Sequence, residues 1–118
     1  MKYRSKITSI GELAFELLEE NDSFIIFNNN APKELAEISF LHTISKFQEE
    51  IAVGDSILLG DKMYTITAIG EEAVHTLKEL GHCTFRFSGK DHVDLPGQIE
   101  LEGSGRPNMR IGDIIAIN

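Results

Sequence analysis

Cysteine, long apolar runs and basic residues are scarce in this sequence, and each scarcity excludes a class of protein. Cys83 is the only cysteine among 118 residues, so the chain forms neither an internal disulfide framework nor a cysteine-based zinc site. No apolar run approaches the roughly 20 residues of a membrane-spanning helix, so we expect no direct membrane insertion. No apolar core follows the basic start of the chain, so we expect no secretory peptide. These features together indicate a reducing, cytoplasmic setting.

Basic residues are also scarce. Lysine and arginine number 11 against 19 aspartates and glutamates, which gives a net charge of −8. Recognition of a nucleic-acid backbone needs a surplus of basic side chains, so we expect no nucleic-acid partner. With 42% hydrophobic and 25% charged residues, the composition is that of a globular chain, and the length predicts a single domain over residues 1–118.

Familiar catalytic and cofactor motifs are missing. The sequence contains no phosphate-cradling glycine loop, no His-Glu-x-x-His helix and no calcium-loop spacing. It also lacks the Gly-x-Ser-x-Gly segment of serine hydrolases. We therefore expect neither a metal nor a cofactor.

What the sequence has is a series of short alternating segments. Apolar and polar residues alternate, or apolar residues cluster, in about eight predicted strands: 2–9, 24–27, 38–45, 56–59, 62–69, 82–87, 98–102 and 113–117. Two short amphipathic helices are predicted at about 10–20 and 73–80, with Gly81 ending the second, and residues 33–37 fit one helical turn. The pattern predicts a mostly-β fold, a small closed barrel, because closure removes exposed strand edges.

Local signals suggest how some of these elements begin. Ser9 precedes Glu12 by the three residues of a capping box, which predicts that the first helix begins at about residue 10. The segments Val53-Gly54-Asp55 and Ile111-Gly112-Asp113 are similar turns that each precede an apolar strand. The shared chemistry of Gly-Asp turns explains this similarity, and the alternative interpretation is that the two segments belong to two related strand-turn units.

His42 stands out among the four histidines. It follows Phe40 and Leu41 in a predicted strand with little charge. A hydrogen-bonded core histidine is one interpretation. The other is a histidine poised near neutral pKa, whose unprotonated nitrogen attacks a phosphorus or carbon centre.

A second group of polar residues shares one face of the strand at 82–87. His82, Thr84 and Arg86 have the same parity there. An imidazole, a hydroxyl and a guanidinium on one face suit an anion, since arginine offers a planar fork of donors. An ordinary polar outer face explains the same pattern.

Several segments together resemble the glucitol/sorbitol-specific IIA component of the bacterial phosphoenolpyruvate-dependent sugar phosphotransferase system. They are Phe40-Leu41-His42, Thr67-Ala68-Ile69-Gly70, Leu77-Lys78-Glu79-Leu80-Gly81-His82-Cys83-Thr84-Phe85-Arg86-Phe87-Ser88-Gly89 and Leu95-Pro96-Gly97. The similarity runs from the first strand to Gly112-Asp113. The stretch at 79–89 is its most specific part.

The resemblance implies a phosphoryl carrier and two protein partners. Such proteins accept a phosphoryl group from the phosphocarrier HPr on a histidine and pass it to the IIB part of the IIB/IIC membrane permease. They form part of a protein-N(pi)-phosphohistidine–sugar phosphotransferase. The family's Phe-aliphatic-His segment maps the phosphorylated residue to His42. One relative has a second histidine two residues later, where this chain has Ile44, so that histidine is not essential here.

Three residues are predicted to bind the phosphoryl oxygens around His42, namely His82, Arg86 and Thr43. Strand parity puts His82 and Arg86 on one face without telling whether that face meets His42. Which ring nitrogen of His42 takes the phosphoryl group depends on a hydrogen bond that the sequence does not reveal.

Two other functions stay open at this stage. One is a non-catalytic β-barrel of the same fold that binds a ligand or a regulator. The other is an interaction module that forms a homodimer by exchanging hairpins, which short hinge loops favour. The resemblance also implies that the permease, and not this chain, mainly chooses the polyol.

Overall fold

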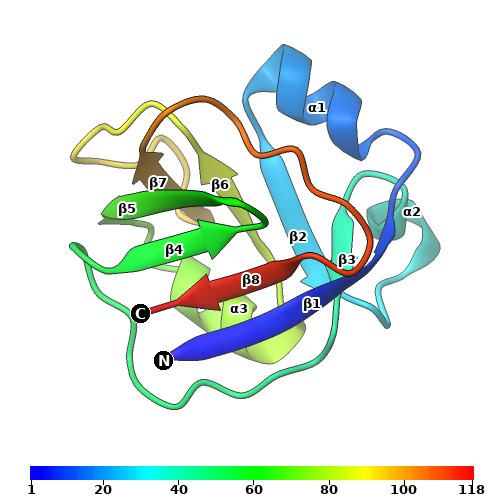
Figure 1. Cartoon of the computed structure of the whole chain (residues 1–118), viewed down its shortest axis with the longest axis horizontal. Coiled ribbons are helices and arrows are strands. Elements are labelled where there is room, and N and C mark those ends of the chain that lie inside the picture. Colours follow the sequence, from blue (N-terminus) through cyan, green and yellow to red (C-terminus); the bar gives the residue numbers. More distant parts are fainter.

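Eight strands close into a barrel in the computed structural model, which describes all 118 residues (Figure 1). The strands are β1 (Tyr3–Ile10), β2 (Phe24–Asn28), β3 (Phe40–His42), β4 (Ser56–Leu59), β5 (Lys62–Ile69), β6 (Cys83–Arg86), β7 (Gln98–Glu102) and β8 (Ile114–Ile117). Their order around the barrel is β1-β3-β2-β6-β7-β5-β4-β8. The pairs β2–β3 and β6–β7 are parallel, and the other pairs are antiparallel. The predicted mostly-β closed barrel is confirmed.

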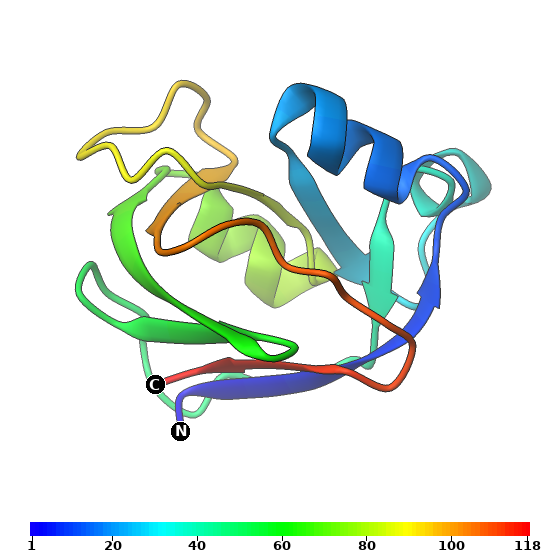
Figure 2. The same ribbon diagram turned by 45° about the horizontal axis from the view of Figure 1, so that its top comes forward.

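Two helices cover opposite ends of this barrel (Figures 1 and 2). They are α1 (Ala14–Asn21) and α3 (Ala73–Leu80), and each buries one alanine and one leucine against the core. The third helix, α2 (Lys33–Ala36), is a single turn at the place where one was predicted. None of the three is both long and apolar enough to cross a membrane.

Period-two alternation determines which side chains fill the barrel. In β1, Tyr3, Ser5 and Ile7 are buried, while Arg4 and Lys6 are exposed. This pattern is expected of a strand with one solvent-exposed face, because successive side chains point to opposite sides of the strand. The outer face of β1 therefore carries basic side chains.

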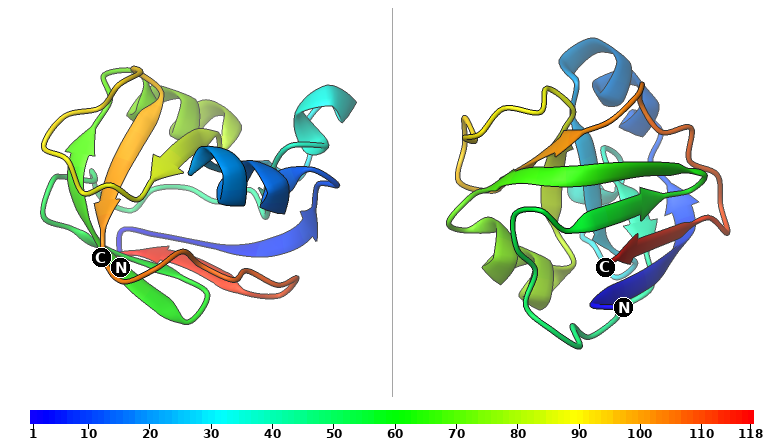
Figure 3. Two further views of the ribbon diagram at one scale, coloured as in Figure 1. Left: turned by 90° about the horizontal axis from the view of Figure 1, so that it is seen from above. Right: turned by 60° about the vertical axis from the view of Figure 1, so that its left-hand side comes forward.

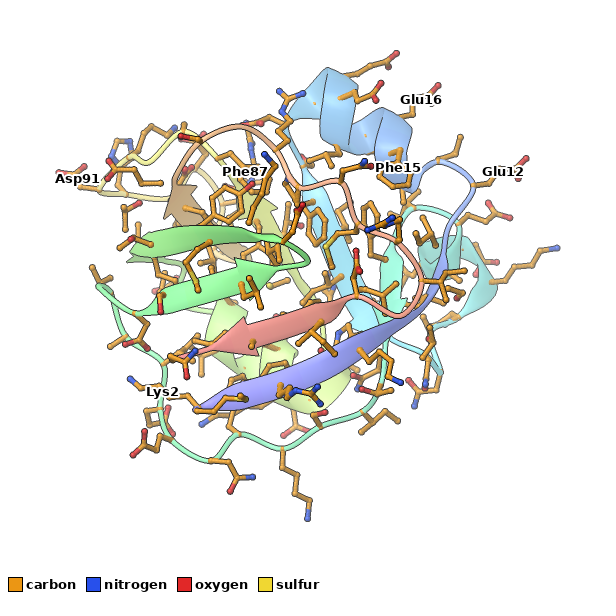
Figure 4. The ribbon with its side chains drawn as sticks, viewed as in Figure 1. Lys2, Glu12, Phe15, Glu16, Phe87 and Asp91 are labelled. Carbon is orange, nitrogen blue, oxygen red and sulfur yellow. The ribbon has the colours of Figure 1, made fainter.

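Aromatic rings pack the end of the barrel under α1. Phe24 and Phe40 stack with ring centroids 4.4 Å apart, and Phe15 from α1 meets Phe40 edge-on at 5.1 Å. Figure 4 shows Glu12 and Glu16 extending away from the barrel at this end. The amphipathic pattern of this helix is thus explained by one aromatic-packed face and one acidic, solvated face.

The predicted capping box at residues 9–12 is wrong, because β1 runs past the first of these residues. The backbone N–H of Gly11 donates to the carbonyl of Ser39 at 2.8 Å, so the chain after β1 bonds to the segment before β3 and does not yet form a helix. Helix α1 begins only at Ala14, and its cap residue Leu13 makes no side-chain hydrogen bond.

The two Gly-Asp turns have the same construction. Gly54 and Gly112 have φ angles of 98° and 96°, which glycine adopts without the strain of a side chain. In both turns the aspartate carboxylate accepts the backbone N–H of the residue three positions earlier, at 2.8 Å. The turn chemistry predicted for both segments is confirmed.

Candidate functional site

His42 is the last residue of β3 and lies between two strands. It is paired in register with Ile7 of β1 and with Asn28 of the parallel strand β2. Its side chain shares the inward parity of Phe40, and its exposed fraction is 0%. The imidazole therefore lies inside the barrel, at the end that α3 covers.

Hydrogen-bond acceptors surround both ring nitrogens. Nε2 lies 2.7 Å from the carbonyl oxygen of Gly81, directly after α3. Nδ1 lies 3.0 Å from the carbonyl oxygen of Thr43 and 3.4 Å from the Tyr3 hydroxyl. A carbonyl only accepts and a neutral ring carries one proton, so the shorter of the two carbonyl contacts, the one to Gly81, assigns that proton to Nε2, and the Thr43 carbonyl then receives no hydrogen bond from the ring. In the neutral ring the lone pair is then on Nδ1, where Tyr3 donates its hydroxyl hydrogen.

Burial sets the protonation states of this pair. The loss of hydration lowers the pKa of His42 below its usual value of 6.5, and the two carbonyls oppose this shift without overcoming it. Burial also raises the pKa of Tyr3, so its hydroxyl keeps its proton. The site thus holds a neutral imidazole, which is the nucleophilic form of histidine.

Gly81 supports this arrangement in two ways. Its φ of 63° ends α3 in the left-handed conformation, as the sequence predicted. A Cβ at this position would also overlap the side-chain oxygen of Asn28 and lie 2.9 Å from Cε1 of His42. Only glycine lets the end of α3 approach the imidazole closely enough to receive its hydrogen bond.

His82 follows Gly81 but has its own surroundings. It is half-buried, and its Nδ1 donates to the carbonyl of Ile26 at 3.0 Å. Its ring packs on Phe27 with centroids 4.8 Å apart. His42 and His82 are therefore joined through the Gly81 backbone, and each ring is held by its own carbonyl acceptors.

Arg86 lies at the opposite end of β6, near α1. Its nearest charged partner is Asp22, at 3.9 Å, and it is paired in register with Glu100 of β7. Asp22 also accepts a hydrogen bond from Arg106 at 3.0 Å. The structure therefore brings Arg86 together with the α1 end and not with His42.

Thr43 is the predicted supporting residue that contacts His42 directly. Its carbonyl faces Nδ1, and its hydroxyl oxygen accepts the backbone N–H of Lys6 at 3.0 Å. Sequence reasoning missed three other neighbours of the ring, namely Tyr3, Asn28 and Gly81. Tyr3 and Asn28 could have been found only from their inward-facing positions in β1 and β2, and the sequence marked Gly81 only as the end of a helix.

No group of three or more histidine, cysteine, aspartate or glutamate side chains lies close enough together to hold a metal ion. Cys83 lies buried in the core, where the loss of hydration raises the pKa of its thiol.

Comparison with known proteins gives one consistent result. The sequence model of the family described as "PTS system glucitol/sorbitol-specific IIA component" matches residues 2–116. The PTS system glucitol/sorbitol-specific EIIA component of Escherichia coli K12 is 32% identical over 113 residues, which cover 96% of this chain and 91% of the relative. The component of the same description from Shigella flexneri gives the same values.

A solved structure supports the same assignment. The crystal structure of the PTS system IIA component from Enterococcus faecalis V583 superposes with a TM-score of 0.81 at 25% identity. The match covers 96% of this chain and 97% of that one. The barrel and these relatives define the class of protein, a IIA component of a sugar phosphotransferase system.

Within that class, the chain belongs to the glucitol/sorbitol-specific IIA family. IIA components are phosphoryl relay proteins, so the chain is a component of a sugar phosphotransferase system with phosphotransfer partners. The resemblance predicted from the sequence is confirmed.

Proposed function

We propose that this chain accepts a phosphoryl group from HPr on His42 and passes it to the IIB part of a glucitol/sorbitol permease in the cytoplasm. Family membership supports the relay role. The position of His42 in the Phe40-Leu41-His42 segment, which forms β3, supports the choice of residue.

The observation that carries the proposal is the 2.7 Å contact between Nε2 of His42 and the Gly81 carbonyl. It holds one proton on Nε2 and orients the ring, so the Nδ1 lone pair is the nucleophile. In the transfer, this lone pair attacks phosphorus while the P–N bond of the donor breaks. The electron pair of that bond stays on the donor imidazole, and each ring keeps the proton on its other nitrogen.

The complete burial of His42 adds a condition. A phosphoryl group reaches Nδ1 only if the residues that cover the ring move apart. The segment that follows β3, residues 43–55, contains no helix or strand and lies next to the ring in sequence. Closure of this cover after transfer would keep water from the labile P–N bond.

The three supporting residues differ in how the geometry favours them. Thr43 follows His42 directly, and its hydroxyl, which accepts the Lys6 N–H, still has a hydrogen to donate to a phosphoryl oxygen, whereas His82 follows the glycine that holds Nε2. Arg86 is paired with Asp22 at the other end of the barrel. We therefore propose a supporting role for Thr43 first and His82 second, and Arg86 has the weakest support of the three.

Labelling by the complete relay tests the proposal. The protein is incubated with phosphoenolpyruvate, Enzyme I and HPr, and an acid-labile phosphate is measured. His42→Gln should remain unlabelled, and it keeps a side-chain N–H near the Gly81 carbonyl, which protects the fold. If His42→Gln is labelled like the intact protein, the assignment to His42 is wrong. His82→Ala and Arg86→Ala variants that label at the full rate would remove the supporting roles of those residues.

A second candidate function is a non-catalytic regulatory module of the same fold. The observation that favours it is the 0% exposure of His42, since the ring then serves only to join α3 to β1 and β3. An intact protein that stays unlabelled with active partners would establish this alternative and overturn the relay.

A further inference from the structure

A pocket of about 310 Å³ opens beside Tyr3 at the α3 end of the barrel. Its lining residues are Met1, Tyr3, Arg4, Ser45, Lys46 and Gln48. None of these is acidic, although acidic residues outnumber basic ones by 19 to 11 in the chain. Two cations, a hydroxyl and an amide thus line one opening, and these are groups that bind phosphoryl oxygens.

The two cations of this pocket have no carboxylate partner. Lys2 and Lys78, the other basic residues in this region, form ion pairs at 2.9 and 2.6 Å. Figure 4 shows Lys2 at the start of β1, directly before the pocket residue Tyr3 in the chain. Arg4 and Lys46 are exposed and form no ion pair, although Lys46 also borders a neighbouring pocket that Glu49 and Glu50 line, so both cations can contact a ligand without breaking an ion pair.

Tyr3 connects the pocket to the candidate nucleophile. It lines the pocket, and its hydroxyl lies 3.4 Å from Nδ1 of His42. On its other side the Tyr3 ring stacks on Phe47, with centroids 4.6 Å apart. Ser45 stands three residues after His42, in the segment that must open for transfer. Nδ1 of His42, which carries the lone pair, therefore faces Tyr3, and Tyr3 separates this nitrogen from the pocket.

We propose that Arg4, Lys46 and Ser45 bind the oxygens of the incoming phosphoryl group and direct it past Tyr3 to Nδ1 of His42. The inference rests on the proposed relay through His42. The ligand is a phosphoryl group carried on the imidazole of a partner protein. Inorganic phosphate shares its oxygens and serves as the probe for binding alone.

The first experiment tests binding without any partner. Inorganic phosphate is titrated into the ¹⁵N-labelled, unphosphorylated protein, and amide shifts are followed. The shifts should be largest at Arg4, Ser45 and Lys46, and added salt should weaken them by screening. The double variant R4Q/K46Q should bind phosphate about tenfold more weakly, because each exposed charge contributes a few-fold in affinity. Lys33→Gln, an exposed lysine on α2, is the matched control and should bind like the intact protein.

The second experiment tests delivery from a protein. Phosphorylated HPr is mixed with each variant, and the initial rate of labelling is measured. R4Q/K46Q should be labelled about tenfold more slowly at subsaturating HPr, whereas Lys33→Gln should match the intact protein. Shifts spread over the surface, or full-rate labelling of R4Q/K46Q, overturn the pocket as the delivery site. Phosphate shifts at the pocket in a protein that HPr does not label mean that the relay has failed, and the delivery role fails with it.

Discussion

The two ends of the barrel hold their charged side chains in opposite ways. At the α1 end, Arg86 and Arg106 converge on Asp22, so two cations share one carboxylate. At the α3 end, Arg4 and Lys46 line a pocket without any carboxylate. Figure 3 shows the two helices on different sides of the barrel.

This contrast identifies the cations that are available to bind a ligand. A paired arginine must give up its partner before it binds an oxyanion, whereas an unpaired one exchanges only water. The sequence predicted Arg86 as one of three residues that support His42, and Arg86 stands in the most specific stretch of the family resemblance. In the structure, the basic residues that line the pocket beside Tyr3 are Arg4 and Lys46, which both lie outside that stretch.

The largest effect is expected from adding one methyl group at the α3 end. Gly81→Ala combines left-handed strain with overlap of Asn28 and His42, which should lower the free energy of unfolding by about 2–4 kcal/mol. Chemical denaturation measures this change. The variant should also lose labelling by HPr, because the methyl group displaces the imidazole from its acceptor.

Gly89→Ala is the matched control at the α1 end. Gly89 also has a positive φ, of 67°, but its Cβ would meet only the exposed Glu102 side chain, at 3.3 Å. Its cost should be about 1–2 kcal/mol from backbone strain alone, with labelling intact. Equal effects of the two substitutions on labelling would contradict a special role for the α3 end.

The next effect is a dependence of stability on pH that arises from the buried ring of His42. Its folded-state pKa is lower than the unfolded value of 6.5, so between these two values only the unfolded chain takes up the proton. The free energy of unfolding should therefore fall as the pH drops below 6.5 and stop falling below the folded-state pKa. Denaturation curves at several pH values measure the slope.

Comparison with His42→Gln isolates this contribution. The variant lacks the titrating ring, so its stability should change less between pH 7 and the onset of carboxylate titration. A slope that is the same in both proteins would show that His42 is solvated in the folded state, against the 0% exposure of its ring.

Much of the fold follows from local patterns in the sequence. Alternation predicted the strands, and Gly81 and the two Gly-Asp turns were recognised because their chemistry is contained within a few residues. The start of α1 was wrong for the opposite reason. The backbone of Gly11 is used by Ser39, a partner 28 residues away that no local rule reveals.

The candidate site likewise combines features that the local sequence predicts with contacts between distant residues that it does not predict. His42 was found because it is an unusual residue in an apolar strand, and the family segment supported it. Its partners Tyr3 and Gly81 come from positions 39 residues away on either side, and barrel closure brings them together. Strand alternation gave the face of each side chain but not the end of the barrel, so it did not reveal that Arg86 lies beside Asp22 near α1.

The smallest effect is expected at the α1 end, from Asp22→Asn. Asp22 has a φ of 54°, and asparagine tolerates this left-handed conformation, so the substitution removes charge without adding strain. Its ion pairs with Arg86 and Arg106 are partly solvated, so the free energy of unfolding should change by at most about 1 kcal/mol, and by less in high salt. The rate of labelling by HPr should not change, although two arginines lose their shared carboxylate. A faster rate would mean that the freed arginines draw in the phosphoryl donor, and the contrast between a structural α1 end and a functional α3 end would then be wrong.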